Sequence, residues 1–144
     1  MTKDIISLIN KKLKELEQNL IFLKNVSFEI NRENLKKDII RYWGIERGIH
    51  ICIESVIDIA NILISSSEIE KPSTYRETIL ILSELDIIPK NFSKDLAKMV
   101  GFRNILVHDY INIDEEIILD VLNNKLNDFI RFTSYINKWV KENY

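Results

Sequence analysis

Residues 35–65 restrict the fold of this chain more than any other stretch does. Apolar residues at helical spacing form one stripe along it, and a second set extends apolar surface around most of the helix. The two sets are Leu35, Ile39, Tyr42, Ile49, Ile53, Val56, Ala60 and Leu63, and Ile40, Trp43, Ile51, Cys52, Ile57, Ile59, Ile62 and Ile64. Such a helix is buried on more than one side, so it is either central in a bundle or covered by a second subunit. We favour a symmetric homodimer.

The remaining apolar patterns predict four more helices. Stripes at spacings of three and four cover residues 5–23, 75–85, 92–107 and 117–140. The expected caps or first residues of the last four helices are Glu33 or Asn34, Ser73 or Thr74, Asn91 or Ser93, and Asp114. No alternating run is long enough for a strand, and 144 residues suffice for one domain with a real core. We therefore predict an all-α, five-helix up-and-down bundle in a single domain over residues 1–144.

Composition excludes several classes of site. The single cysteine, Cys52, allows no internal disulfide framework, and with two histidines in the chain it leaves no zinc-ligand cluster. We expect no metal and no cofactor. Because no uninterrupted apolar run reaches the roughly 20 residues of a membrane span, and the start of the chain leads into an amphipathic pattern, we expect a cytoplasmic protein without a membrane partner.

Net charge argues against a protein that coats nucleic acid. The chain carries a formal charge of −2 and has a sequence pI of 5.8, so any contact with RNA must be local. Lys94 and Lys98, with Lys90, recur every four residues toward Arg103 and are candidates for RNA binding. The competing interpretation is a solvated helix face.

Most of the polar chemistry lies within residues 101–110. A guanidinium, a carboxamide, an imidazole, a carboxylate and a phenol follow one another where the apolar pattern ends, on Arg103, Asn104, His108, Asp109 and Tyr110. An imidazole that moves a proton, beside a cation that stabilises charge on phosphoryl oxygens, suits reactions at phosphorus.

A line of polar residues crosses the apolar helix predicted over residues 35–65. Its members follow at intervals of three or four and therefore share one face; this polar seam is Arg47, His50, Glu54, Asp58 and Asn61. One interpretation is an exposed strip in which His50 pairs with Glu54. The other is that the seam faces Arg103 and His108, with Glu54 and Asp58 as supporting residues that orient them.

The motif resembles that of a known family. The spacing of Arg103, His108 and Tyr110 is similar to the R-x4-H-x-Y signature of HepT-like ribonuclease toxins of the HEPN superfamily. Four residues separate the arginine from the histidine, and one separates the histidine from the tyrosine. Three further stretches resemble that family as well. They are residues 101–104 before the histidine, residues 111–114 after the tyrosine, and the helical run 45–65. The resemblance covers nearly the whole chain and implies a HEPN-like helical fold.

The resemblance implies metal-independent RNA cleavage, in which a ribose 2′-hydroxyl attacks the adjacent phosphorus. His108 would then be the general acid or base, and Arg103 would bind phosphoryl oxygens. Asn104 would position a phosphate or the histidine, and Asp109 would orient the ring. In the family, the tyrosine that Tyr110 matches receives AMP from an antitoxin, a nucleotidyltransferase of the MntA type. The competing interpretation is that Tyr110 only packs in the loop.

Helix geometry sets a condition on this site. Five residues at about 100° each place Arg103 and His108 roughly 140° apart around a straight helix. Either the helix loosens near Val107, or two subunits assemble the site, and the resemblance implies a cleft between paired subunits. The alternative function is a non-catalytic HEPN-type helical binding module that partners a nucleotidyltransferase.

Overall fold

The computed structural model describes residues 2–108 and 114–144, and every regular element in these residues is helical. The elements are α1 (Lys3–Ser27), α2 (Ile39–Ser65), α3 (Tyr75–Glu84), α4 (Lys90–His108), α5 (Glu115–Asp120), a π-helical turn η1 (Val121–Lys125) and α6 (Leu126–Asn143). Because α5, η1 and α6 follow one another without a break, they make one helical segment. The prediction of an all-α, five-helix bundle is confirmed.

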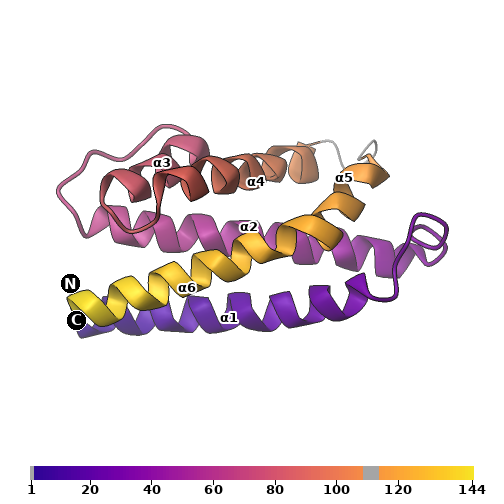
Figure 1. Cartoon of the computed structure of the whole chain (residues 1–144), viewed down its shortest axis with the longest axis horizontal. Helices are drawn as coiled ribbons and strands as arrows, with labels where there is room; N and C mark the ends of the chain where they lie inside the picture. Colours follow the sequence, from indigo (N-terminus) through magenta and orange to yellow (C-terminus); the bar gives the residue numbers. More distant parts are fainter. Residues whose placement is uncertain (1, 109–113) are drawn as a thin grey trace.

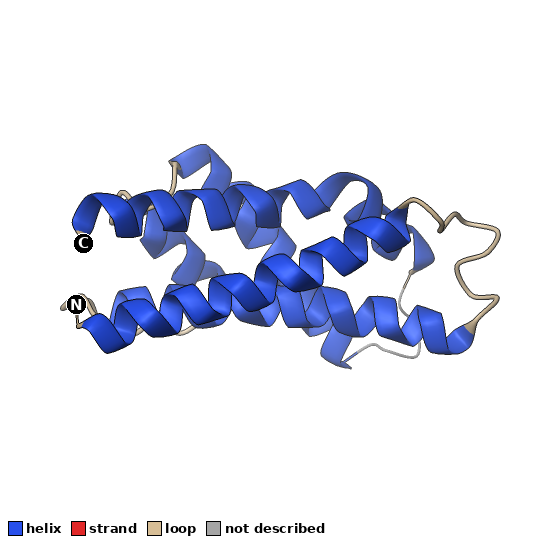
Figure 2. Cartoon of the chain, turned by 90° about the horizontal axis from the view of Figure 1, so that it is seen from below, coloured by secondary structure: helices blue, strands red, loops and turns tan. Residues whose placement is uncertain are grey.

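Helix α2 is the central element of the bundle. The α3–α4 pair lies on one side of it, and α1 and α6 lie on the other (Figure 1). The first and last helices bring the two ends of the chain to the same end of the bundle (Figures 1 and 2). Most of the broad apolar surface of α2 is therefore buried within one subunit, by contact with four other helices, whereas Ile40 and Trp43 near its start stay exposed.

The packing of α1 on α2 follows from a narrow apolar stripe and a glycine. The stripe is buried, as predicted, and consists of Ile9, Leu13, Leu16, Leu20 and Leu23. A Cβ atom built on Gly48 of α2 would lie 3.0 Å from Leu23 Cδ2. The absence of a side chain at Gly48 thus permits the close approach of the two helices.

The start of α2 differs from the prediction. The helix begins at Ile39 and not near Leu35, because the Asp38 carboxylate accepts hydrogen bonds from the backbone N–H groups of the first turn. Before it, Asn31 and Asn34 exchange hydrogen bonds between their backbone N–H groups and side-chain oxygens, which holds the connection in a compact turn. Leu35 is only 1% exposed, so the connection itself contributes to the core.

The other helix starts agree more closely with the sequence. The Thr74 hydroxyl accepts from the backbone N–H of Glu77 at 3.1 Å, and the Asp114 carboxylate accepts from that of Glu116 at 2.9 Å. Helix α4 begins slightly earlier than expected, at Lys90, directly after Pro89. The last helix was expected to be regular, but η1 interrupts it, and a π-helical turn has no signature in apolar spacing.

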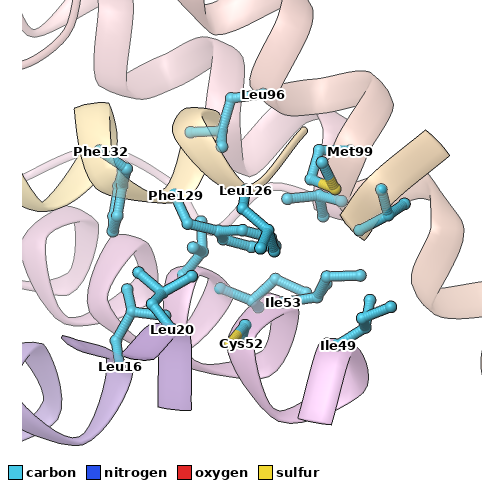
Figure 3. Packing of buried hydrophobic residues seen from close by; sticks show 14 of the residues in the cluster. Leu16, Leu20, Ile49, Cys52, Ile53, Leu96, Met99, Leu126, Phe129 and Phe132 are labelled. Atoms are coloured by element: carbon cyan, nitrogen blue, oxygen red, sulfur yellow. The ribbon is translucent and has the colours of Figure 1, made fainter. Parts of the chain in front are cut away.

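The core lies between α2 and the helices on both of its sides (Figure 3). Phe129 and Phe132 of α6 are fully buried and meet residues of α1, α2 and α4. Cys52 lies in this cluster, where burial raises the pKa of its thiol to about 12, so the thiol is an inert apolar group.

Helix α2 is long and apolar enough to cross a membrane by length and composition alone. Half of its most apolar stretch of 18 residues is buried inside the protein. Because the core helix of a globular protein passes the same test, this property does not by itself place α2 in a membrane.

Candidate active site

Arg103 is held between α2 and α3 by two different contacts. Its Nε donates a hydrogen bond to Glu54 Oε1 at 2.6 Å, and its guanidinium carbon lies 4.7 Å from the centroid of the Tyr75 ring. One contact restrains the edge of the guanidinium and the other restrains its face. Among the side chains that the structure describes, Arg103 makes its hydrogen bond through Nε, and both Nη atoms lie on the opposite edge of the guanidinium from this contact.

The polar seam extends this contact along α2. Arg47 Nη1 lies 3.0 Å from His50 Nδ1, and His50 Nε2 lies 3.1 Å from Glu54 Oε1. Because a guanidinium only donates, Nδ1 of His50 must accept, and the proton on Nε2 is donated to Glu54. Glu54 Oε1 therefore receives donors from both sides, His50 and Arg103.

These contacts determine the charge state of the pair. Partial burial raises the pKa of Glu54, but hydrogen bonds from Arg103 and His50 lower it more, so the net pKa lies below its ordinary value of 4.5. The hydrogen bond to Glu54 in turn raises the pKa of Arg103. Near neutral pH the pair is an ionised carboxylate holding a permanent cation.

The structure brings some of the predicted residues to Arg103 and not others. Glu54 contacts it directly, whereas Asp58 points toward α1 and pairs with Lys12 Nζ at 3.4 Å. Asn104 is exposed and lines a pocket together with Asn61 of the seam. Helix α4 is regular up to His108, the last residue described before the gap at 109–113.

Three predicted site positions lie outside what the structure describes. They are the side chain of His108 and the residues Asp109 and Tyr110. Their roles remain predictions from the motif.

The two candidate RNA-binding lysines lie on another face of α4. Lys94 and Lys98 are exposed and line a groove of about 530 Å³ with Arg76 and Lys90. Five residues separate Lys98 from Arg103, which corresponds to roughly 140° around the helix. One RNA strand that contacts both Arg103 and the groove lined by Lys94 and Lys98 would therefore have to pass around α4.

Tyr75 was not recognised from the sequence as a site residue. It was assigned to the apolar stripe of its helix, but the structure places its partly exposed ring over Arg103. No local pattern distinguishes such a tyrosine from a core aromatic, since its partner lies on a different helix. Within the part of the chain that the structure describes, no group of three His, Cys, Asp or Glu side chains is arranged to hold a metal ion.

Comparisons with known proteins agree with this architecture. A family model described as Ribonuclease HepT-like matches residues 8–136. The mRNA nuclease HepT of Shewanella oneidensis is 36% identical over 85 residues, which are 59% of this chain and 64% of that protein, so the match spans just under two thirds of that relative. The tRNA nuclease HepT of Aphanizomenon flos-aquae is 24% identical over 135 residues, 94% of this chain and 86% of that protein.

A solved structure shows the same fold. The tri-AMPylated Shewanella oneidensis HEPN toxin in complex with MNT antitoxin superposes with a TM-score of 0.75 at 28% identity, over 96% of this chain and 99% of that chain.

Proposed function

The chain belongs to the Ribonuclease HepT-like family, and on this premise we propose that it is an endoribonuclease toxin neutralised by a nucleotidyltransferase antitoxin of the MntA type. Relatives named as mRNA and tRNA nucleases support the activity. The similar HEPN toxin solved in complex with MNT antitoxin supports the partner. The reaction is metal-independent cleavage of RNA, as the R-x4-H-x-Y resemblance implies.

The observation that carries this proposal is the restrained guanidinium of Arg103. Glu54 binds its Nε at 2.6 Å and the Tyr75 ring covers its face, so its Nη edge is oriented before any ligand arrives. Two parallel N–H donors match two phosphoryl oxygens, and a preoriented donor stabilises charge that grows on them during the reaction. Arg103 is therefore the phosphate-binding group, and Glu54 is the residue that positions it.

His108 supplies the proton transfer in this proposal. Its imidazole takes the proton from the ribose 2′-hydroxyl as the new oxygen–phosphorus bond forms, and the bond from phosphorus to the 5′-oxygen breaks. The leaving oxygen takes a proton, which gives a 2′,3′-cyclic phosphate and a 5′-hydroxyl. Asp109 orients the ring, and Asn104 positions the phosphate.

Two copies of the chain assemble the cleft. Arg103 and His108 lie five residues apart near the end of α4, so one helix does not direct both side chains to one point. On α2, Ile40 and Trp43 precede the polar seam on the same face and are 75% and 60% exposed. A second subunit that covers these apolar side chains and continues along the seam would reach Glu54 and Arg103, about 16 Å beyond Trp43, which supports a homodimeric site.

Tyr110 is the site of control in this proposal. The antitoxin transfers AMP from ATP to its phenol oxygen with release of pyrophosphate, which places phosphate charge two residues from His108. The added nucleotide then occupies the phosphate site of Arg103 and prevents binding of RNA by charge and by volume.

The competing function is a non-catalytic binding module that partners a nucleotidyltransferase. The ion pair between Arg103 and Glu54 favours it, because this contact also has a purely structural explanation. RNA cleavage in EDTA by the wild type, Arg103→Ala and His108→Ala separates the two functions. Loss of cleavage in both variants, each of them folded at the assay temperature, supports the nuclease, and equal behaviour of all three proteins supports the binding module.

Neutralisation of the toxin by AMP transfer to Tyr110 needs a separate measurement. Cell growth is followed after induction of the wild type or Tyr110→Phe, with and without an MntA-type nucleotidyltransferase. We expect rescue of the wild type and not of Tyr110→Phe, whereas rescue of both would overturn the role of Tyr110.

A further inference from the structure

A polar pocket opens beside the candidate active site. It has a volume of about 610 Å³ and lies between α2, the connection formed by residues 66–74, α3 and α4. The side chains that carry its chemistry are Asn61, Lys71, Tyr75, Arg76 and Asn104, and Gly101 forms part of the α4 wall. Pockets of this size accommodate a small organic ligand such as a nucleotide.

The pocket and Arg103 share a wall. Tyr75 lines the pocket, and its ring also lies over the guanidinium of Arg103 at 4.7 Å. Asn104, which directly follows Arg103 on α4, lines the pocket as well. A ligand in the pocket would therefore lie next to a phosphate bound by Arg103.

The lining matches the parts of a nucleotide. Lys71 and Arg76 are exposed cations that suit a phosphate, and the carboxamide of Asn61 offers the paired donor and acceptor that recognise a base edge. An inorganic anion would leave this carboxamide unused, and an apolar ligand would leave both cations unused. We propose that this pocket binds the nucleotide next to the cleaved phosphodiester of a single-stranded RNA, a proposal that rests on the nuclease function above.

Gly101 provides a way to fill the pocket without straining the backbone. A Cβ atom built on it meets no atom within 4 Å, so a larger side chain extends into open space. Gly101→Ala adds only this Cβ atom and also raises helix propensity, which makes it the matched control for Gly101→Leu.

The test measures RNA binding and cleavage separately. Binding uses a short RNA oligomer with 2′-O-methyl riboses, which lacks the attacking hydroxyl, and is followed by fluorescence anisotropy. We expect Gly101→Leu to raise the Kd of this oligomer, and the KM for unmodified RNA, about tenfold with a smaller change in kcat. Gly101→Ala should behave as the wild type. Asn61→Leu should change the base preference of cleavage, because it removes a base-reading group outside the reacting centre.

The outcomes distinguish this proposal from the nuclease function. If the wild type cleaves RNA and Gly101→Leu keeps its Kd and KM, the pocket proposal is overturned and the nuclease function stands. If the wild type binds the methylated oligomer without cleaving RNA, and Gly101→Leu weakens that binding, the pocket is an RNA-binding site and the nuclease function is overturned. A wild type that neither cleaves nor binds overturns both.

Discussion

Two carboxylates on the same face of α2, one helical turn apart, form ion pairs with different helices, and the two pairs differ in their surroundings. Glu54 reaches Arg103 on α4 at 2.6 Å, and Asp58 reaches Lys12 on α1 at 3.4 Å. The Glu54 carboxylate also accepts from His50, and Tyr75 covers the guanidinium. The side chain of Asp58 is 49% exposed, and that of Glu54 is 34% exposed.

The difference separates an organised site from an ordinary surface contact. An exposed pair with one contact is worth about 0–1 kcal/mol, because water screens the charges and two long side chains must be ordered. The guanidinium of Arg103 is restrained from two helices, so its orientation is set before a ligand binds. We therefore expect changes at Glu54–Arg103 to affect cleavage, and changes at Asp58–Lys12 to have little effect.

The largest expected effect comes from Arg103→Lys, which keeps the positive charge and removes the planar guanidinium with its paired N–H donors. A lysine ends in a single ammonium and lacks the separate, coplanar Nε and Nη donors that let a guanidinium bind Glu54 on one edge and two phosphoryl oxygens on the other. Loss of a preorganised donor typically lowers the rate by about 10²–10³-fold, and we expect a fall of this size in the rate of RNA cleavage. A rate within threefold of the wild type would show that charge alone suffices. Lys12→Arg serves as the control in the other pair.

Glu54→Gln should have the next largest effect, and Asp58→Asn is its matched control. Glutamine keeps the shape of the side chain but lacks the charge that holds Arg103. We expect kcat/KM for RNA cleavage to fall about tenfold, equivalent to one charge-assisted hydrogen bond of roughly 1.5 kcal/mol. Asp58→Asn should leave kcat/KM unchanged. Equal losses in the two variants would contradict the distinction between the pairs.

Acid should weaken the Glu54–Arg103 ion pair, because it protonates the Glu54 carboxylate. The pKa of Glu54 is lower in the folded protein than its ordinary value of 4.5. Its contribution to stability is therefore fully present above that ordinary value and is lost as the pH falls through the lower, folded pKa. The melting temperature of the wild type minus that of Glu54→Gln, measured from pH 7 downward, should shrink below about pH 4.5. A constant difference across this range would contradict the assignment.

The smallest effect is expected at Lys12. Lys12→Met removes the cation of the exposed pair and keeps most of the side-chain volume. We expect urea unfolding to show a change of about 1 kcal/mol or less and RNA cleavage to stay at the wild-type level. A loss of more than about 2 kcal/mol in the free energy of unfolding would contradict the distinction between the Asp58–Lys12 and Glu54–Arg103 pairs.

Part of the fold and of the site was predictable from local patterns. Apolar spacing predicted the helices, and side-chain oxygens at Thr74 and Asp114 predicted two of their starts, because both signals act within one or two turns. The motif indicated Arg103, and the seam spacing indicated Glu54. The start of α2 was missed, since Leu35 is buried by tertiary packing from a non-helical connection, and apolar spacing does not distinguish that from a helix.

The sequence by itself determined that the chain is a helical bundle with α2 at its centre or at an interface, and that a guanidinium lies near the end of the apolar pattern of α4. Only the tertiary structure decided that Glu54 and not Asp58 binds Arg103, that Tyr75 covers it, and that a pocket adjoins it. Residues one turn apart on the seam are equivalent in spacing, and their partners depend on which neighbouring helix each one meets. That choice is made by the packing of whole helices over long sequence separations, which local periodicity does not contain.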